Sequence, residues 1–426
     1  MKAHLPETNQ KRIVIIGGGF GGLKLARELS NSNYQIVLID KNNYHQFQPL
    51  FYQVATAGLE PSSISFPFRK IFQKSTNVLI RVAEIIRIDQ ERNRLESNIG
   101  IINYDYLVIA IGADTNFFGN QQIMERAIPM KSVGEALALR NTILQNYEEA
   151  VLADQEDELE GLMNIVVVGG GPTGVEVSGT LAEMKNQVLP KDYPELDFNK
   201  MQVYLLEGSP KVLGSFSEHA SAKAEEYLRK LGVNLKCSTR VKDYDGKTIF
   251  LEGGATIRSN TLVWAAGIIG NRIQGLDEKV IGRGNRILVD RFNKVNDSSN
   301  IYAIGDVALM TEDAYPNGHP QVAQVAIQQG ELLAKNFKSM LQDKSLKQFF
   351  YKDLGSMATI GRNKAVADIG KIKLQGVFAW MVWMFVHLMS IVGVKNKILI
   401  FINWAWNYIT FDQSLRLILK AKTKNK

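Results

Sequence analysis

The sequence predicts an α/β chain with two Rossmann-like dinucleotide-binding domains, followed by C-terminal amphipathic helices. A β-branched apolar run followed by glycines at G-x-G-x-x-G spacing occurs twice, as KRIVIIGGGFGG at residues 11–22 and NIVVVGGGPTG at residues 164–174. A third observation, a tryptophan-rich apolar segment at residues 377–411, predicts the helices.

The glycines of each copy have separate tasks at a phosphate-binding turn. The first allows a sharp turn, the second lets backbone amides approach a pyrophosphate, and the third lets the next helix pack against its strand. These positions are Gly17, Gly19 and Gly22 in the first copy and Gly169, Gly171 and Gly174 in the second. A lone glycine pattern indicates little, but the recurrence of strand, glycines and helix makes an accidental turn the weaker interpretation.

An acidic residue ends the next apolar run in both copies. Asp40 follows the first fingerprint and Glu207 follows the second, where a carboxylate can accept hydrogen bonds from ribose hydroxyls. A carboxylate at Glu207 would also repel the extra phosphate of NADP, which favours NADH.

Composition places the chain among ordinary globular proteins. It has 426 residues, 45% hydrophobic and 22% charged content and a net charge of +7. No basic motif interleaved with aromatic residues is present, so nucleic acid is not an expected partner. Residues 1–10 are polar without an apolar core, so we expect the chain to stay in the cytoplasm. The single cysteine, Cys237, excludes a dithiol relay, an iron–sulfur cluster or a cysteine zinc site, and no metal site is expected.

Three further apolar runs are expected to be buried strands. YDYLVIAIG at residues 104–112 and TLVWAAG at residues 261–267 form a matched pair, and we interpret them as the returning strands of the two domains. They end at Gly112 and Gly267, which we add to the candidate cofactor-binding residues. A third run, NIYAIGD, places Asp306 at a strand end.

This order of motifs resembles the two-dinucleotide-domain flavoproteins typified by glutathione reductase. The resemblance implies that Gly17, Gly19, Gly22 and Asp40 hold the ADP part of FAD and that Asp306 binds its ribityl end. Gly169, Gly171, Gly174 and Glu207 would bind NADH. The FAD domain would be discontinuous, at residues 1–115 and 289–365, with an NADH domain inserted at 116–288 and membrane-anchoring helices at 366–426.

The segment AQVAIQQG, which begins at Ala323, resembles the quinone-site motif of type II NADH dehydrogenases. We expect it to start a helix with Gln324 and Gln328 on one face, where neutral amides can bind quinone carbonyls, and with Ala323 beside the cofactor. A polar helix start with surface glutamines is the structural alternative.

Three further segments extend this resemblance, NYHQFQPL at residues 43–50, GVE at residues 174–176 and GRN at residues 361–363. It implies that Pro49 and Leu50 approach the isoalloxazine and that Glu176 lies between the nicotinamide and quinone sides. A carboxylate complementing the helix dipole is the alternative for Glu176.

The C-terminal segment is expected to lie in a membrane surface. Residues 377–394 carry no formal charge if His387 is neutral, and their number is just within the length that spans a bilayer. In the next segment the polar residues Asn396, Asn403, Asn407, Thr410 and Ser414 share one helical face. We expect the apolar side in lipid, tryptophans near headgroups and the tail lysines Lys420, Lys422, Lys424 and Lys426 attracted to anionic lipid. A dimerisation hairpin and a single transmembrane anchor are the alternatives.

The resemblance therefore implies a respiratory NADH:quinone oxidoreductase that does not pump protons. It would pass a hydride from NADH to FAD, and then two electrons to a membrane quinone, ubiquinone or menaquinone. Its place would be the cytoplasmic face of the bacterial plasma membrane, and a homodimer is left open. The alternatives are an NADH reductase with a protein or soluble acceptor and a redox-sensing flavoprotein. A sulfide:quinone reductase is disfavoured by the single cysteine.

Overall fold

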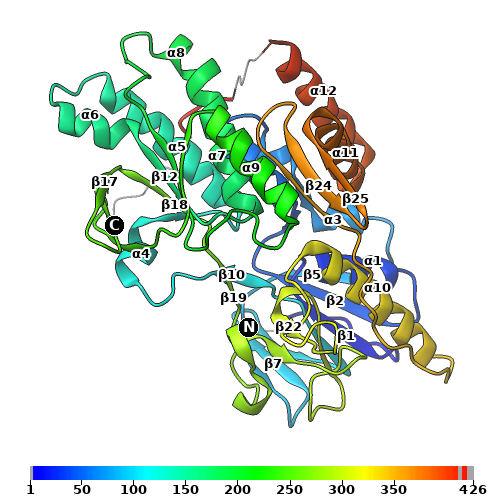
Figure 1. Cartoon of the computed structure of the whole chain (residues 1–426). Coiled ribbons are helices and arrows are strands. Elements are labelled where there is room, and N and C mark those ends of the chain that lie inside the picture. The colour runs from blue at the N-terminus through cyan, green and yellow to red at the C-terminus, as the bar shows by residue number, and fades with distance from the viewer. Residues whose placement is uncertain (1–2, 411–414, 420–426) are drawn as a thin grey trace. The chain divides into compact units, whose positions relative to one another are not determined.

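The structure, a computed structural model, describes residues 3–410 and 415–419 (Figure 1). These residues form two compact units. The first unit holds the residues up to 46, 66–114 and 268–353, and the second unit holds 47–65, 115–267 and those from 354 onward. The chain returns to the first unit at residue 268, earlier than the domain boundary expected at 289, and the C-terminal helices belong to the second unit.

The first unit is built on a five-stranded parallel sheet in the order β21-β9-β1-β2-β5. In its register Val14 of the first fingerprint strand lies between Val37 and Leu107. The strands are mostly buried, as expected for β-branched runs in a parallel sheet with both faces covered. Their bounds are β1 Arg12–Ile16, β2 Gln35–Asp40, β5 Val78–Val82, β9 Tyr106–Ile109 and β21 Ile301–Ala303. Helices α1 (Phe20–Glu28) and α10 (Ala323–Met340) pack against each other in this unit (Figure 1).

The second unit repeats this topology. Its parallel sheet has the order β11-β18-β12-β13-β14, with Val166 between Tyr204 and Leu262. The returning strand, fingerprint strand, acid-terminated strand and third strand therefore have the same order in both sheets, which confirms the two Rossmann-like folds and the two returning strands. The bounds are β11 Ile128–Pro129, β12 Ile165–Val168, β13 Val203–Leu206, β14 Val233–Lys236 and β18 Thr261–Trp264, with helices α5 Val133–Ala150, α7 Pro172–Gln187 and α9 Glu218–Lys230.

Smaller elements complete both units. Each carries a three-stranded antiparallel sheet inserted before its returning strand, β6-β7-β8 in the first and β15-β16-β17 in the second. These strands are β6 Ile85–Asp89, β7 Arg94–Ser97, β8 Gly100–Asn103, β15 Val241–Tyr244, β16 Thr248–Leu251 and β17 Thr256–Arg258. The other strands are β3 Tyr44–Gln46, β4 Ser65–Pro67, β10 Ala113–Thr115, β19 Ile268–Gly270, β20 Ile287–Leu288 and β22 Ala308–Leu309. The short helices are α2 Phe51–Ala55, α3 Phe68–Ile71, α4 Gln121–Arg126, α6 Glu156–Met163 and α8 Leu189–Asp192.

The second unit ends in an antiparallel sheet and two apolar helices. The sheet is β23-β24-β25 and the helices are α11 and α12, with bounds β23 Ser356–Thr359, β24 Ala365–Ile369, β25 Ile372–Gln375, α11 Gly376–Ser390 and α12 Val394–Thr410. Ala379 of α11 packs on Ala365 and Ala367 of β24. Within the described residues, neither α11 nor α12 nor another helix has the length and apolar character needed to cross a bilayer.

One tryptophan of α12 lies elsewhere than expected. Trp404 is 8% exposed and so does not sit at a headgroup surface, whereas Trp406 is 59% exposed; in α11, Trp383 is 1% exposed. Trp404 points into the protein because its indole N–H donates to the Gln53 side chain at 2.7 Å. Asn407 belongs to the polar face that the sequence predicts for this helix. Its side chain donates to the Gly58 carbonyl at 3.1 Å, so this face packs on the protein at Asn407. Ser414 and the lysine tail from Lys420 lie outside the described residues.

Candidate functional site

The first glycine fingerprint forms a tight strand-to-helix turn between β1 and α1. Gly17 has a φ of +100°, and a Cβ there would lie 2.3 Å from the Ala110 carbonyl oxygen. A Cβ at Gly22 would lie 1.9 Å from the Gly17 carbonyl oxygen, so only glycine fits. A Cβ at Gly19 would meet no protein atom within 4 Å. The protein thus keeps free the space in front of the α1 N-terminus, as a bound pyrophosphate requires.

Asp40 and His45 both bond to the backbone of Gly18 in this turn. The Asp40 carboxylate accepts hydrogen bonds from the Gly18 N–H at 2.7 Å and the Asn42 N–H at 2.8 Å. Burial raises the pKa of Asp40, and the two N–H donors act against that rise. His45 is 3% exposed and its Nδ1 lies 2.9 Å from the Gly18 carbonyl oxygen. Because burial lowers the pKa of His45, the ring is neutral and donates to that carbonyl. This arrangement fits the ADP part of FAD.

A second turn in the first unit presents Asp306. Gly305 has a φ of +75° and its N–H donates to the side chain of Gln329 at 2.7 Å. The amide of Gln321 donates to the Asp306 carbonyl at 2.9 Å. Sequence reasoning missed Gln329, which is 1% exposed and comes directly after the expected quinone-site residue Gln328. Its buried amide holds the turn that carries Asp306.

The second fingerprint reproduces the geometry of the first. Gly169 has a φ of +108°, and a Cβ there would lie 2.4 Å from the Ala265 carbonyl oxygen. A Cβ at Gly174 would lie 1.8 Å from the Gly169 carbonyl oxygen, whereas one at Gly171 would meet nothing within 4 Å. The Glu207 carboxylate accepts from the Gly170 N–H at 2.5 Å and the Ser209 N–H at 2.6 Å. The turn therefore fits a second dinucleotide, with Pro172 starting α7 behind it.

The remaining cofactor candidates lie in loops after strands. Gly112 and Gly267 follow the two returning strands with φ values of +68° and +156°. Their carbonyls accept backbone hydrogen bonds from Asn271 and Asn116, respectively. Pro49 and Leu50 lie in a 3-10 turn, Gln48–Leu50, of the second unit, with Leu50 buried.

The AQVAIQQG segment starts α10, with Ala323 as its first residue. The Tyr351 hydroxyl donates to the Gln324 side chain at 3.3 Å. Gln328 pairs with the backbone of Lys352: its amide donates to the Lys352 carbonyl at 2.8 Å and accepts from the Lys352 N–H at 3.0 Å. A side-chain amide has two N–H donors, so one donor of Gln328 is left for another acceptor. All these residues belong to the first unit.

Glu176 is a buried acid in the second unit. It is the fifth residue of α7, beyond the first turn, and is 8% exposed, so a surface role at the helix dipole does not describe it. The Thr359 N–H lies 3.4 Å from its carboxylate. Burial raises the pKa of Glu176 to about 8, while Thr359 and the nearby indole of Trp383 lower it. The Trp383 N–H is buried, and no acceptor among the described residues, Glu176 included, meets the usual distance and angle limits for a hydrogen bond with it.

A cavity of about 110 Å³ lies in the second unit beside these residues. Thr359 and Trp383 line the cavity, and each also interacts with Glu176, which lies behind them and is not a lining residue. Aromatic side chains form much of the remaining wall, including Tyr52, Trp380, Trp404 and Tyr408. A cavity with aromatic walls and a few polar groups is typical of a site for a planar organic molecule.

Glu183 and Arg362 form the polar side of this cavity. The backbone N–H of Arg362 donates to the Glu183 carboxylate, and burial raises the pKa of Glu183. The Arg362 guanidinium donates to the carbonyls of Asn407 at 2.8 Å and Tyr408 at 3.0 Å at the end of α12. Sequence reasoning missed Glu183, although it lies seven residues after Glu176 and therefore on the same face of one helix.

Two parallel dinucleotide folds, each with a fingerprint turn, define the class of this chain as a two-domain α/β oxidoreductase. Comparison with known families agrees: residues 11–330 match the family described as pyridine nucleotide-disulphide oxidoreductase, and residues 354–410 match the NDH2 C-terminal domain. The chain is 35% identical over 415 residues to the type II NADH:quinone oxidoreductase NdhA of Mycobacterium tuberculosis, covering 93% of this chain and 87% of that protein. The chain belongs to the type II NADH:quinone oxidoreductase family.

Other relatives and solved structures are consistent with this family. The type II NADH:quinone oxidoreductase of Staphylococcus aureus is 29% identical over 368 residues, covering 85% of this chain and 90% of that protein. NDH2 from Plasmodium falciparum in complex with NADH has the same fold, with a TM-score of 0.89 at 22% identity over 97% of this chain and 100% of that chain. The sulfide:quinone oxidoreductase of Aquifex aeolicus is similar in fold at a TM-score of 0.71 and 20% identity, covering 91% of this chain and 92% of that chain.

Proposed function

We propose that this chain is a non-proton-pumping NADH:quinone oxidoreductase that acts with bound FAD. The observation that carries the proposal is the presence in one chain of two nucleotide turns and of a buried carboxyl group, Glu176, beside an aromatic cavity. Bound FAD supplies the two-electron chemistry, because its ring system accepts a hydride from NADH and is reoxidised by quinones. The overall balance is NADH, one proton and quinone giving NAD⁺ and quinol.

The residues of the chain bind and orient the reactants and handle protons. The Gly17 to Gly22 turn, Asp40 and Asp306 would hold FAD, and the Gly169 to Gly174 turn and Glu207 would hold NADH. Quinone reduction consumes two protons. With its pKa raised to about 8, the carboxyl group of Glu176 is protonated at neutral pH and can give one proton to a reduced quinone oxygen before it is recharged from solvent.

We propose that the cavity beside Glu176 admits the quinone ring. The stacked and tilted aromatic side chains around it offer flat apolar surface, and the indole of Trp383 in its wall also interacts with the Glu176 carboxyl group. Independently of this cavity, the sequence motif supports our proposal that Gln324 and Gln328 of the first unit are amides for quinone carbonyls, since Lys352 leaves one donor of Gln328 unused.

The activity is tested with protein purified from detergent-extracted membranes. We expect NADH absorbance to fall quickly when a short-chain ubiquinone analogue is present and slowly when it is absent. Bleaching of the flavin by NADH without reoxidation by quinone would contradict a quinone acceptor while leaving the nucleotide sites intact. A protein or soluble acceptor would then replace the quinone in the proposal.

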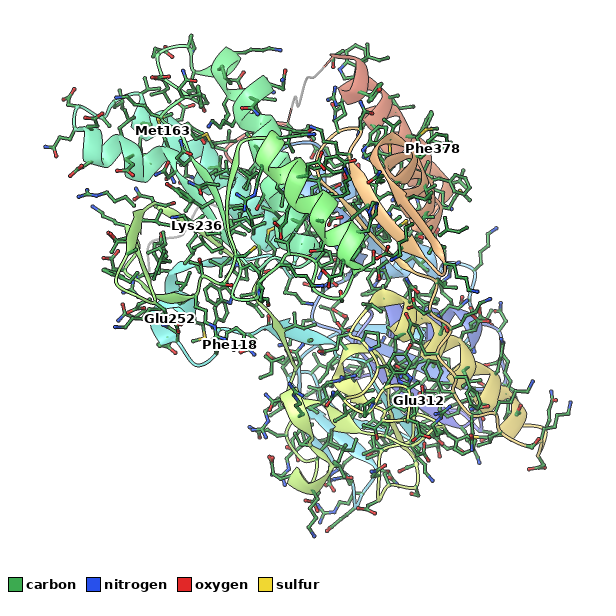
Figure 2. The ribbon with its side chains drawn as sticks, in the orientation of Figure 1. Phe118, Met163, Lys236, Glu252, Glu312 and Phe378 are labelled. Carbon is green, nitrogen blue, oxygen red and sulfur yellow. The ribbon has the colours of Figure 1, made fainter. Side chains whose placement is uncertain are left out.

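We further propose that α11 and α12 bind the cytoplasmic face of a bacterial plasma membrane as a monotopic anchor. Both helices expose large apolar side chains, and Phe378, labelled in Figure 2, is 76% exposed on α11. Further exposed side chains on these helices are Met381, Phe385, Met389, Ile398, Phe401, Ile402, Trp406 and Ile409. Such an apolar surface beside Lys395 and Lys397 is typical of a helix that lies in the interface of an anionic bilayer.

Serine substitutions at Phe385 and Phe401 test this surface. The two rings are 66% and 56% exposed, so the fold should tolerate their loss. Each phenylalanine contributes roughly 1.5–3 kcal/mol when buried, so F385S/F401S should bind anionic vesicles at least ~100-fold more weakly in a sedimentation assay. Leu152→Ser, at an 80% exposed position outside these helices, is the matched control and should bind like the wild type. Unchanged vesicle binding with loss of a dimer would instead make this face a dimer interface.

A further inference from the structure

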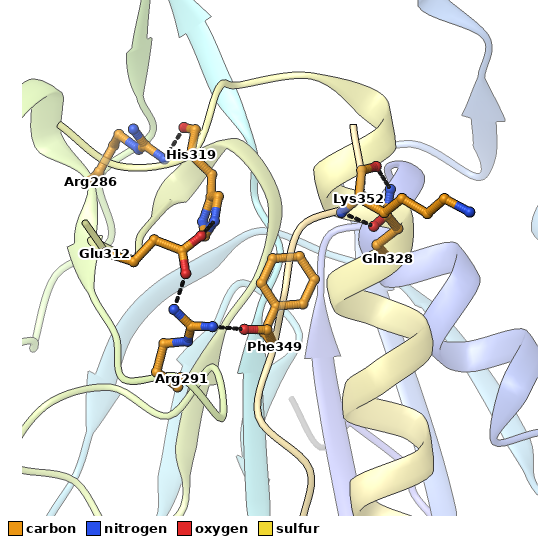
Figure 3. Close-up of polar contacts among 7 residues, drawn as sticks. All are labelled: Arg286, Arg291, Glu312, His319, Gln328, Phe349 and Lys352. Carbon is orange, nitrogen blue, oxygen red and sulfur yellow. Dashed lines mark hydrogen bonds and ion pairs between the residues drawn. The ribbon is translucent and has the colours of Figure 1, made fainter. Parts of the chain in front are cut away.

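A polar cluster of Arg291, Glu312 and His319 lies in the first unit (Figure 3). The Glu312 carboxylate contacts His319 Nε2 at 2.7 Å with one oxygen and pairs with the Arg291 guanidinium through the other. Arg291 also donates to the Phe349 carbonyl. His319 is 1% exposed, so the cluster is formed largely out of contact with solvent.

The protonation of this cluster follows from its contacts. An ionised carboxylate can only accept hydrogen bonds, so His319 must carry its proton on Nε2. Burial, together with the charges of Arg291 and Arg286, lowers the pKa of His319 to about 4, so the ring is neutral at physiological pH. Its Nδ1 has no hydrogen-bond partner among the described residues, and the rings of Tyr315, Phe349 and Tyr351 pack around it.

The cluster joins two segments that contact the start of α10. His319 belongs to the segment that leads into α10. The Arg286 guanidinium donates a hydrogen bond to the His319 carbonyl at 3.0 Å. The Arg291 guanidinium donates to the Phe349 carbonyl, and Tyr351 and Lys352 lie two and three residues further along the chain. These two residues make the contacts described above with Gln324 and Gln328, as Figure 3 shows for Gln328 and Lys352.

We propose that Arg291, Glu312 and His319 are positioning residues for Gln324 and Gln328 of α10, the side-chain amides that we assign to the quinone. The proposal rests on the proposed function, because it assigns these amides to quinone. The cluster touches no fingerprint glycine, and it acts by fixing both the backbone before α10 and the segment that holds the two glutamine side chains. It should therefore affect reoxidation of the flavin by quinone and leave reduction of the flavin by NADH unchanged.

The test compares two substitutions of His319 that differ in where they place an N–H. In H319Q the amide nitrogen is as many bonds from Cβ as Nε2, so it can still donate to Glu312. In H319N the amide nitrogen takes the place of Nδ1 and falls short of Glu312. In stopped-flow experiments with the FAD-loaded enzyme, we expect H319N to slow reoxidation by decylubiquinone about tenfold or more and H319Q to restore most of the rate.

Tyr34→Phe is the matched control. The Tyr34 hydroxyl donates a buried hydrogen bond at 2.9 Å to Phe337, near the other end of α10, so its loss weakens the same helix without touching the cluster. We expect Y34F to lower the Tm but to keep the wild-type reoxidation rate. Equal rates for H319N and H319Q, or equal slowing of both half-reactions, would overturn the positioning role. Failure of the wild type itself to be reoxidised by the quinone would overturn the proposed function and this inference with it.

Discussion

Replacing Glu176 with glutamine is expected to slow quinone-dependent reoxidation of the flavin by roughly 10²–10⁴-fold, while flavin reduction by NADH stays near the wild-type rate. Glutamine keeps the shape of the buried side chain but cannot release a proton. NADH oxidation needs no acid or base from the protein, so only the acceptor half-reaction should respond. Single-turnover stopped-flow traces of the flavin absorbance, recorded separately with NADH and with quinone, measure the two rates.

The rate of flavin reoxidation by quinone should depend on pH through the carboxyl group of Glu176. Because burial raises the pKa of Glu176 to about 8, the proton is present below that pH and is lost as the pH rises through it. Wild-type reoxidation should therefore fall between about pH 7 and pH 9. The same carboxyl group makes stability depend on pH, because it is ionised in the unfolded chain above about pH 4.5 but stays protonated in the folded state up to about pH 8. The wild-type Tm should therefore fall between about pH 4.5 and pH 8 more than that of E176Q and level off at higher pH.

Asp368→Asn serves as the control for this experiment. The Asp368 carboxylate accepts hydrogen bonds from the backbone and side chain of Ser217, in the same unit as Glu176, and it borders neither the cavity nor a fingerprint. D368N should alter stability without changing the pH profile of either half-reaction. An E176Q enzyme that loses both half-reactions equally, or that keeps the wild-type pH profile, would contradict a role for Glu176 in supplying protons.

Valine at the middle glycine of a fingerprint, Gly19 or Gly171, is expected to abolish binding of the nucleotide at that turn and to leave binding of the other nucleotide intact. Gly19 and Gly171 have φ values of −66° and −72°, which any residue adopts, and a Cβ at either meets no protein atom within 4 Å. The substitutions should therefore cost the fold only about 1 kcal/mol, through the weaker helix cap. A branched side chain would nevertheless fill the space that the pyrophosphate needs.

The two variants are controls for each other. G19V should be purified without FAD, as judged by its visible absorbance, but should still bind NADH in a fluorescence titration. G171V should retain FAD and bind NADH at least ~100-fold more weakly. If G19V kept its flavin and G171V lost it, the two sites would be assigned the wrong way round. Normal binding of both nucleotides by both variants would mean that the pyrophosphates approach elsewhere.

Local patterns were enough to predict the nucleotide turns. Gly17 and Gly22 are required by contacts with backbone a few residues away or on the neighbouring strand, so their spacing alone carries the information. The two returning strands could be predicted for the same reason, since each half repeats one strand–turn–helix–strand pattern. The cavity beside Glu176 was harder to predict because its lining residues converge from distant segments of the chain.

Trp383 illustrates the limit of the sequence argument. An apolar helix with several tryptophans is typical of a membrane surface, and the pattern does not show that this ring instead stacks on His387 and lies beside Glu176. Its place depends on the packing of α11 against β24, which no local spacing encodes. Glu183 could have been predicted from the sequence, because it lies seven residues after Glu176 and is therefore a second acid on the buried face of α7.

The near-identity of the two fingerprint turns bears on how long each nucleotide stays bound. A Cβ at the third glycine would come equally close to backbone in the two turns, 1.9 Å at Gly22 and 1.8 Å at Gly174, and in both the acid holds the middle of the turn. A flavoprotein dehydrogenase must retain one nucleotide through many cycles and release the other in each. The difference in residence time must therefore come from elements around the turns. In the first unit, His45 bonds to Gly18 of the turn and Gln329 bonds to Gly305 beside Asp306, so we expect these two side chains to slow the dissociation of the flavin.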